Sequence, residues 1–353
     1  MSAASGSRFP FPIPFGWFCV GYPHEFEAGT PRAIYYFATH LVAWRDDDGG
    51  LHVQEAFCPH LGAHLGHGGK VDDGCLVCPF HGWKFGADGA NVEIPYSERT
   101  NKKARLRTYP TCEVNGLSFV WYHPDEAVAP MWTMPQLPEC EDDEAWVPVL
   151  STDYTIGTTW QEMAENGVDS AHFRYVHNTA EVPELDSYES GFPMAEMRSS
   201  QKFQTPRGVV EGRIDSTSHG PGMSVVHFSG FVDLCNIAAT TPIEGDRCII
   251  RFNFRVKDLG DAKTTHGVGM AFANEVHKQV LEDKVIWEHK AHLIRPALAD
   301  TDGPFMKFRK WAAQFYAEGV DGTDERLTFE PPWWPDRADE APAKATASAR
   351  IEG

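Results

Sequence analysis

The sequence predicts an α+β protein in which an all-β N-terminal domain precedes an α+β domain built on an antiparallel sheet. Short β-prone runs separated by Gly, Pro, Asp and Asn fill the first part of the chain, for example residues 33–37 and 117–122. Longer alternating strands follow, such as residues 247–256, and then one long helical stretch over residues 274–292. With 353 residues, the chain is long enough for two domains with cores of their own.

The boundaries follow from changes in composition along the chain. We expect the all-β domain over residues 1–130, because a Pro- and acid-rich connector, residues 130–143, comes next. The α+β domain should occupy residues 131–335 and end at the Pro-Pro-Trp-Trp-Pro run of residues 331–335. Residues 336–353, rich in Ala, Asp, Glu and Lys, are typical of a disordered tail.

The first domain carries two short arms that each combine a cysteine with a histidine. One is Cys58-Pro59-His60, and the other, 17 residues later, is Cys78-Pro79-Phe80-His81. A [2Fe–2S] cluster of the Rieske type binds one iron through two thiolates and the other through two imidazoles. Each arm supplies one ligand of each kind, so the sequence predicts such a cluster. Gly82 and Trp83 follow the last ligand, where a tight turn and an aromatic ring would shield the cluster from water.

A structural zinc site is the alternative for the same four side chains. In zinc sites a cysteine is usually paired with a nearby cysteine and a histidine with a nearby histidine, as in C-x₂₋₄-C and H-x₃₋₅-H. A cysteine paired with a histidine on both arms therefore favours the cluster. Cys75 forms an apparent C-x-x-C with Cys78, but using it would destroy the mixed pairing, and we interpret it as a packed residue. His64 and His67 lie between the arms and are interpreted as solvated loop histidines.

The second domain contains Asp169-Ser170-Ala171-His172 followed, five residues after His172, by His177. Two histidines and one carboxylate on one face of ferrous iron leave positions open for dioxygen and substrate. Because an ideal helix turns residues i and i+5 away from each other, a shared metal requires a π-bulge or a helix that ends between them. The alternative is two unrelated histidines on a polar helix.

The third ligand is sought on the helical stretch of residues 274–292. Val276, Val280, Asp283 and Trp287 share one inward face, while Glu275 and Glu282 belong to a solvated face, as does His277. A carboxylate within an apolar stripe is costly unless a metal or a partner compensates it, so Asp283 is the predicted ligand.

Asp169 lies one helical turn before His172. Its simplest role is to accept a hydrogen bond that fixes the His172 imidazole, as metal-bound histidines usually require.

The two motifs resemble those of the Rieske-type non-haem iron oxygenases, the terminal components of multi-protein hydroxylases. The similarity extends from Gly16-Trp17 to the helix that bears Asp283. Residues 165–172 and the later Glu282-Asp283 and Ile286-Trp287 are most similar to the branch of the 3-ketosteroid 9α-hydroxylases and cholesterol 7-desaturases.

The resemblance implies a helix-grip catalytic domain, a cluster held by Cys58, His60, Cys78 and His81, and a mononuclear Fe(II) held by His172, His177 and Asp283. It also implies a homotrimer in which Asp169 links His172 to a cluster histidine of the neighbouring subunit. Electrons would come from a ferredoxin or a flavin-dependent ferredoxin reductase.

Composition sets limits on location and partners. The net charge of −19 disfavours nucleic acid and anionic membranes as partners. The eight cysteines show no disulfide-rich pattern, and the apolar run of residues 9–20 is interrupted by prolines and too short to span a bilayer. We therefore expect a cytoplasmic protein without a membrane span.

One basic strip stands out against this acidic background: Arg99, Lys102, Lys103, Arg105 and Arg107. Residues 104–107 alternate as in a half-buried strand, so one interpretation is an ordinary strand with a solvated basic face. The other is a docking site for an acidic electron-transfer partner.

The leading functional hypothesis is a monooxygenase that uses dioxygen to hydroxylate or desaturate a bulky hydrophobic, steroid-like substrate in an apolar cavity of the second domain. Alternatives are an oxygenase or demethylase acting on an aromatic substrate, and a non-catalytic Rieske electron carrier. Arg247, Arg251 and Arg255 alternate along one apparent strand, so one face of that strand could be basic and bind an acid.

Overall fold

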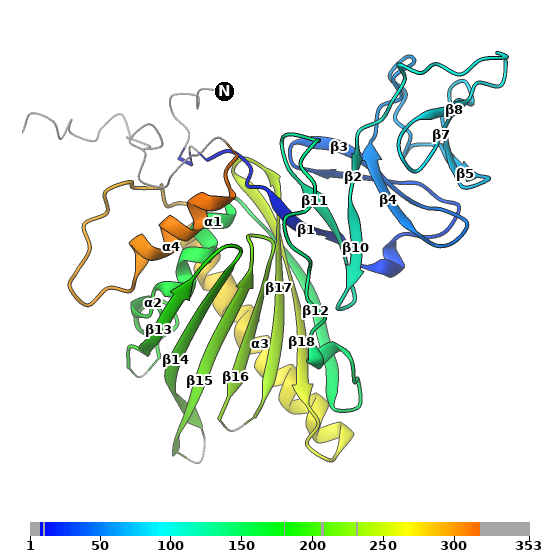
Figure 1. Ribbon diagram of the computed structural model, residues 1–353. Helices are drawn as coiled ribbons and strands as arrows, with labels where there is room; N and C mark the ends of the chain where they lie inside the picture. The colour runs from blue at the N-terminus through cyan, green and yellow to red at the C-terminus, as the bar shows by residue number, and fades with distance from the viewer. Residues whose placement is uncertain (1–7, 10, 180, 206–207, 231, 318–353) are drawn as a thin grey trace, which may run out of the picture.

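The computed structural model describes residues 8–9, 11–179, 181–205, 208–230 and 232–317. The predicted tail, residues 336–353, and the last part of the predicted second domain, residues 318–335, lie outside the described residues. Within them, antiparallel sheets dominate and helices are few, which confirms the predicted α+β class (Figure 1).

Three small antiparallel sheets make up the N-terminal part of the chain. Their orders are β1-β11-β10, β2-β3-β4-β9 and β5-β6-β7-β8. The strands are β1 (Gly16–Gly21), β2 (Arg32–Tyr36), β3 (Thr39–Arg45), β4 (Leu51–Glu55), β5 (Lys70–Asp72), β6 (Cys75–Val77), β7 (Lys84–Phe85), β8 (Asn91–Glu93), β9 (Thr108–Tyr109), β10 (Thr111–Val114) and β11 (Leu117–Tyr122). β11 coincides with the predicted strand of residues 117–122.

A seven-stranded antiparallel sheet dominates the rest of the chain, in the order β12-β18-β17-β16-β15-β14-β13. Its strands are β12 (Trp146–Ile156), β13 (Glu184–Ser190), β14 (Met194–Thr205), β15 (Gly208–His219), β16 (Met223–Ser229), β17 (Leu234–Glu244) and β18 (Arg247–Lys257). The helices are α1 (Trp160–Ala164), α2 (Ala171–Tyr175), α3 (Ala262–Trp287) and α4 (Phe305–Ala312), with 3₁₀ turns η1 (Pro23–Glu25), η2 (Pro138–Cys140), η3 (Glu165–Val168) and η4 (Ala313–Phe315).

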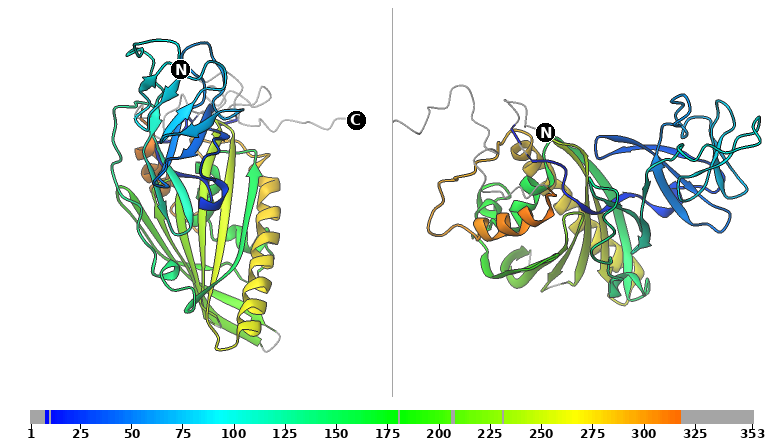
Figure 2. Two further views of the ribbon diagram at one scale, coloured as in Figure 1. Left: turned by 90° about the vertical axis from the view of Figure 1, so that its right-hand side faces the viewer. Right: turned by 45° about the horizontal axis from the view of Figure 1, so that its top comes forward.

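The long helix α3 packs along one face of this sheet, as both figures show (Figures 1 and 2). Phe228 of β16 meets Phe272 edge-on, and the Tyr154 hydroxyl of β12 hydrogen-bonds His277 at 2.7 Å. α3 begins twelve residues before the predicted start. Gly269 lies in this early part because a Cβ there would come within 2.6 Å of Val149, so glycine permits close packing against the sheet.

The opposite face of the sheet meets the N-terminal strands. Arg251 of β18 is buried there, and its guanidinium donates to the Cys19 carbonyl at 3.1 Å and the Tyr36 hydroxyl at 2.7 Å. Thr241 also donates to the Cys19 carbonyl. Arg251 therefore joins the two parts of the chain, and the basic strand face suggested by sequence does not bind a ligand through this residue.

The prediction of a strand over residues 104–107 is wrong, although the predicted alternation of buried and exposed side chains is correct. Ala104 and Leu106 are buried while Arg105 is exposed, but this segment pairs only through a single bridge from Arg105 to Ala90. No helix in the described part of the chain is both long and apolar enough to cross a bilayer.

Candidate cluster and iron sites

The two Cys/His arms form matching turns. In the first, the Gly62 amide donates to the Cys58 carbonyl at 2.9 Å, and in the second the Gly82 amide donates to the Cys78 carbonyl at 3.0 Å. Both glycines have positive φ, 77° and 69°, a conformation that a side chain would strain. The cysteines are buried, and burial, with Cys78 as a further contributor, raises the pKa of Cys58 to about 11.

The histidines of the two arms face each other, with ring centroids 4.7 Å apart. The Nδ1 atoms of His60 and His81 are both buried and have no hydrogen-bond partner among the described residues. Such orphaned nitrogens are rare in folded proteins, and here they belong to the same two arms as the two buried thiols. This donor set fits a Rieske cluster. Trp83, the ring expected to shield the cluster, stacks on His60 with centroids 4.4 Å apart.

The second motif lies on a chain segment of short helical turns. α1 is capped by Thr159, whose hydroxyl accepts from the Glu162 amide, and η3 leads to Asp169. One Asp169 carboxylate oxygen accepts from the amides of Ala171 and His172 at 3.1 and 3.3 Å, and so satisfies two amides at the start of α2. α2 ends at Tyr175, so the predicted break between His172 and His177 is a helix end and not a π-bulge.

His172, His177 and Asp283 come together in space. One donor atom from each lies within 4.8 Å of the others, and the His177 Nε2 to Asp283 Oδ1 distance is 3.3 Å. Asp283 is buried on α3, on the stripe with Val280 and Trp287 that the helical periodicity predicts. The Trp287 indole donates to Asn166 of η3, which fixes α3 against the segment that carries the histidines.

Hydrogen bonds select which nitrogen of each imidazole is free for a metal. His172 Nδ1 is bonded to the Asp169 carbonyl at 2.5 Å, and His177 Nδ1 to Glu282 Oε2 at 2.9 Å. Each ring therefore donates through Nδ1 and leaves Nε2 as the ligand atom. Two neutral imidazoles and a carboxylate fit a mononuclear iron site.

The surroundings shift the pKa values of His172 and His177 in opposite directions. Burial lowers the pKa of His172, although the carboxylates of Asp283 and Asp169 act in the other direction. Burial also disfavours the charged form of His177, but hydrogen bonds to Asp283 and Glu282 outweigh it and raise the pKa of that imidazole.

Glu282 is the functional residue that sequence reasoning misplaced. It does pair with Lys278, as a solvated face implies, but its other oxygen binds His177. No local pattern in the sequence signals this contact, because His177 lies on another element, 105 positions earlier in the chain. His277 is exposed, as predicted.

A cavity of about 650 Å³ opens beside the segment that follows His177. It lies along β14 and β15, and its lining is mostly polar, which differs from the apolar cavity that we expect. The cations in it are neutralised: Lys202 pairs with Glu181 at 2.6 Å, and Arg213 pairs with Asp186 and Asp215 at 3.1 and 3.2 Å. Apolar side chains, including Phe228 and Phe272, instead lie between the sheet and α3.

Two known protein families match this chain in succession. Residues 16–110 match the Rieske [2Fe-2S] domain, and residues 120–316 match the 3-ketosteroid 9α-hydroxylase C-terminal domain. A 3-ketosteroid-9-alpha-monooxygenase oxygenase component of Rhodococcus rhodochrous is 30% identical over 334 residues, which cover 89% of this chain and 88% of the relative. The chain belongs to this family of Rieske non-haem iron oxygenases. Its cofactors are a Rieske [2Fe–2S] cluster and a mononuclear iron.

The oxygenase is also similar to a cholesterol desaturase in sequence and to dicamba monooxygenase in fold. Cholesterol 7-desaturase of Xenopus laevis is 29% identical over 349 residues, covering 90% of the oxygenase and 74% of the desaturase. Dicamba monooxygenase bound to dicamba has the same fold, with a TM-score of 0.71 at 20% identity over 85% of the oxygenase and 96% of that chain. The oxygenase is a Rieske non-haem iron oxidoreductase with a Rieske domain followed by a catalytic domain.

Proposed function

We propose that this oxygenase hydroxylates or desaturates a steroid-like substrate, with its iron held by His172, His177 and Asp283. The supporting observation is the convergence of these three side chains, with both Nδ1 atoms already engaged. Cys58, His60, Cys78 and His81 are the proposed cluster ligands, supported by the buried thiols and the orphaned Nδ1 atoms. An intact iron-binding triad disfavours the non-catalytic electron carrier.

The iron, when bound, would activate dioxygen with electrons relayed through the cluster. The protein itself orients the imidazole rings of His172 and His177 and shields the metal-binding atoms from water. The Asp169 carbonyl and the Glu282 carboxylate hold the two imidazole rings in one tautomer, so that no reorientation is needed when the metal binds. His177 and Asp283 are buried, which keeps bulk water from competing at their donor atoms.

A neutral, multi-ring substrate is favoured over an aromatic acid. The relatives named after 3-ketosteroids and cholesterol cover most of the chain. Lys202 and Arg213, which line the cavity along β14 and β15, are already paired with carboxylates, so they are less available to bind an aromatic carboxylate. Arg251 is buried between the two parts of the chain, and Arg255 pairs with Asp143.

Product analysis tests this assignment. The purified enzyme, supplied with a ferredoxin, its reductase, NADH and a panel of 3-ketosteroids, sterols and aromatic acids, should convert a steroid to a product that is heavier by one oxygen or lighter by two hydrogens. ¹⁸O₂ labelling distinguishes insertion from desaturation. Turnover of an aromatic acid without any response to steroids would overturn the proposal.

We further propose a homotrimer in which Asp169 connects two subunits. The strands beside the cluster arms and α2 lie on opposite sides of the molecule (Figures 1 and 2), so a route through a neighbouring subunit would be shorter for electrons. Exposed apolar side chains occur beside both sites: Leu61 and Phe80 at the cluster, and Tyr175 and Val285 near the iron. Contact between these patches would bury both. Native mass spectrometry tests the trimer.

The electron donor is proposed to be a ferredoxin or a flavin-dependent ferredoxin reductase that docks on Arg99, Lys102 and Lys103. These exposed cations line a hollow that also contains His60 and Trp83. Arg107 is excluded from this surface because its guanidinium binds the His123 carbonyl and lies over the Tyr109 ring, 4.9 Å from its centroid.

A cytoplasmic location and the domain limits of residues 1–130 and 131–335 also remain proposals. All eight cysteines are free, which is typical of a reducing compartment. β11 ends at Tyr122 and β12 begins at Trp146, and a boundary near residue 130 lies between them.

A further inference from the structure

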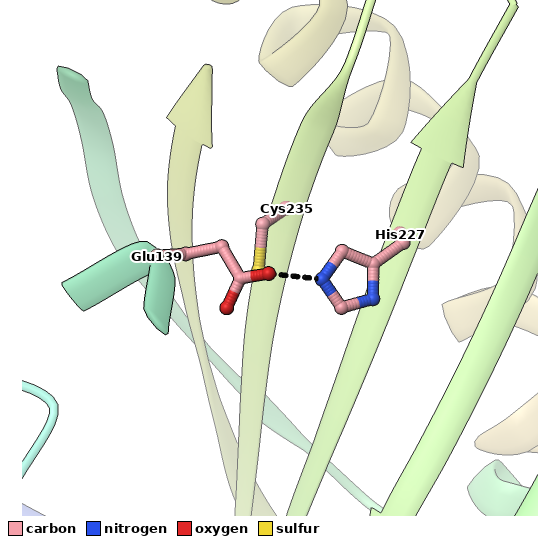
Figure 3. A group of neighbouring side chains, drawn as sticks. All are labelled: Glu139, His227 and Cys235. Atoms are coloured by element: carbon pink, nitrogen blue, oxygen red, sulfur yellow. Dashed lines mark hydrogen bonds and ion pairs between the residues drawn. The ribbon is translucent and has the colours of Figure 1, made fainter. Parts of the chain in front are cut away.

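Three side chains with metal-binding atoms meet on the sheet face that points away from α3, far from the proposed iron ligands in the fold. They are Glu139 of η2, His227 of β16 and Cys235 of β17 (Figure 3). Because Phe228 packs against α3, its neighbour His227 points to the other face. His227 and Cys235 are direct cross-strand partners, so their side chains lie next to each other on that face.

The donor atoms already lie close together. One from each residue falls within 4.8 Å of the others, and His227 Nε2 is 2.7 Å from Glu139 Oε1. Cys235 is fully buried and the Glu139 side chain is 13% exposed, while the His227 side chain is 42% exposed. The group is therefore sheltered on the thiol side and open to water on the imidazole side.

Arg255 holds the connector turn that brings Glu139 to the sheet. It lies opposite Cys235 on β18, and its guanidinium donates to the backbone carbonyls of Glu139 and Trp146, both at 3.1 Å. The same guanidinium pairs with Asp143 at 2.5 Å, which offsets a positive charge that would otherwise oppose a cation. Glu139 is thus positioned by contacts that do not use its carboxylate.

We propose that Glu139, His227 and Cys235 form a zinc site, with water as the fourth ligand. Thiolate, imidazole and carboxylate are the three donor types that zinc uses in proteins, and three protein ligands with water in the fourth position are the coordination known from catalytic zinc sites. Hard cations such as Mg²⁺ avoid thiolate, so the donor set selects a borderline transition metal. This site is separate from the proposed oxygenase centre and does not depend on it.

The three side chains need to move little for zinc to bind. Tetrahedral zinc with bonds of about 2.0–2.3 Å places its ligand atoms about 3.3–3.6 Å apart. Glu139 and His227 would separate slightly from 2.7 Å, and the thiol would approach them. The thiol proton leaves to water as the zinc–sulfur bond forms. His227 donates its Nε2 proton to Glu139 before the metal binds, so this proton must pass through water to Nδ1, which leaves Nε2 with a free lone pair for the zinc. The Glu139–His227 hydrogen bond is then replaced by two bonds to the metal.

Such a site would fasten the connector to the sheet. Glu139 belongs to the segment between β11 and β12, whereas His227 and Cys235 belong to the central strands. A bound zinc would therefore restrain how the cluster-bearing part moves relative to the catalytic sheet.

Zinc stoichiometry tests the site in the holoenzyme. Protein loaded with cluster and iron is incubated with ZnCl₂ in excess MgCl₂, desalted, and analysed for zinc and iron per chain. We expect one zinc gained without loss of iron, no gain in His227→Ala or Cys235→Ala, and zinc affinity weaker by at least about tenfold in Glu139→Gln. Cys112→Ala and His289→Ala, which change a thiol and an imidazole elsewhere, should behave as wild type.

Cobalt provides a readout of the thiolate. Co²⁺ added to the holoenzyme should give a thiolate-to-cobalt charge-transfer band in the difference spectrum, which Cys235→Ala removes. Glu139→Gln keeps the proposal testable if Cys235→Ala does not fold. Zinc uptake that matches iron loss and persists in His227→Ala would place the metal at the iron site and overturn the inference, as would no uptake at all.

Discussion

The hydrogen bond between Glu282 and His177 offers a sharp test of the proposed iron site. Glu282→Gln keeps the length and shape of the side chain but removes the negative charge that accepts from His177 Nδ1 at 2.9 Å. The imidazole would then be a weaker ligand and less firmly oriented, so the variant should bind iron less tightly while retaining the fold.

The structure indicates how much iron affinity Glu282→Gln should lose. A hydrogen bond to a charged group contributes about 1.5–3 kcal/mol. The Glu282 side chain is 28% exposed and also lies 3.8 Å from Lys278, so solvent and this competing partner favour the lower part of that range. About 1.5–2 kcal/mol corresponds to an iron affinity roughly 10–30-fold weaker.

Iron retention against graded chelator measures this change, and electron paramagnetic resonance of the reduced cluster serves as the internal control. Glu275→Gln, an exposed acid on the same helix, should retain iron as wild type, whereas Asp283→Ala should lose it entirely with the cluster intact. Complete loss in Glu282→Gln together with retention in Asp283→Ala would show that the wrong acid was assigned as ligand.

Three further predictions address electron transfer, docking and stability. Asp169→Asn should keep both metal sites loaded but slow electron transfer to the iron by orders of magnitude in single-turnover experiments; normal rates would refute the bridging role. The double variant Lys102→Glu/Lys103→Glu should raise the KM for an acidic ferredoxin, less so at high salt, and leave turnover with a small chemical reductant unchanged. Equal impairment with both donors would refute docking. Burial opposes ionisation of Glu162, but His292 and Lys290 outweigh it and lower the pKa of this carboxyl to about 2 from 4.5. Its stabilising contribution is therefore complete above pH 4.5 and is lost as the pH falls towards 2. Glu162→Gln should cost about 3 kcal/mol near neutral pH, about half of that at pH 3 and little at pH 2, as measured by denaturant unfolding; a cost independent of pH would contradict this.

The periodicity of α3 illustrates how far sequence reasoning reaches. The inward stripe of Val280, Asp283 and Trp287 could be predicted because helix geometry fixes which residues share a face. The start of the helix could not, because Gly267 and Gly269 lower helix propensity. Packing of Gly269 against Val149 compensates for that cost, and only the folded chain contains this contact.

Contacts between distant segments escaped prediction for the same reason. Arg251 was placed on a basic strand face, but its partners Cys19 and Tyr36 lie more than 200 positions earlier in the chain. Glu282 was placed on a solvated face, since neither its spacing nor its neighbours reveal that His177 approaches from another element.

The sequence by itself determined the kind of chemistry, because the donor atoms of a metal site are a property of residue type and short spacing. Cys58, His60, Cys78 and His81 lie on two tight arms, and His172 and His177 lie on one short turn, so local geometry brings most of each set together. Only the tertiary structure decided which nitrogen each histidine presents, which acid supports His177, and that Glu139, His227 and Cys235 meet at all. These depend on the packing of helices and strands that are far apart in the chain, and no local pattern encodes that packing.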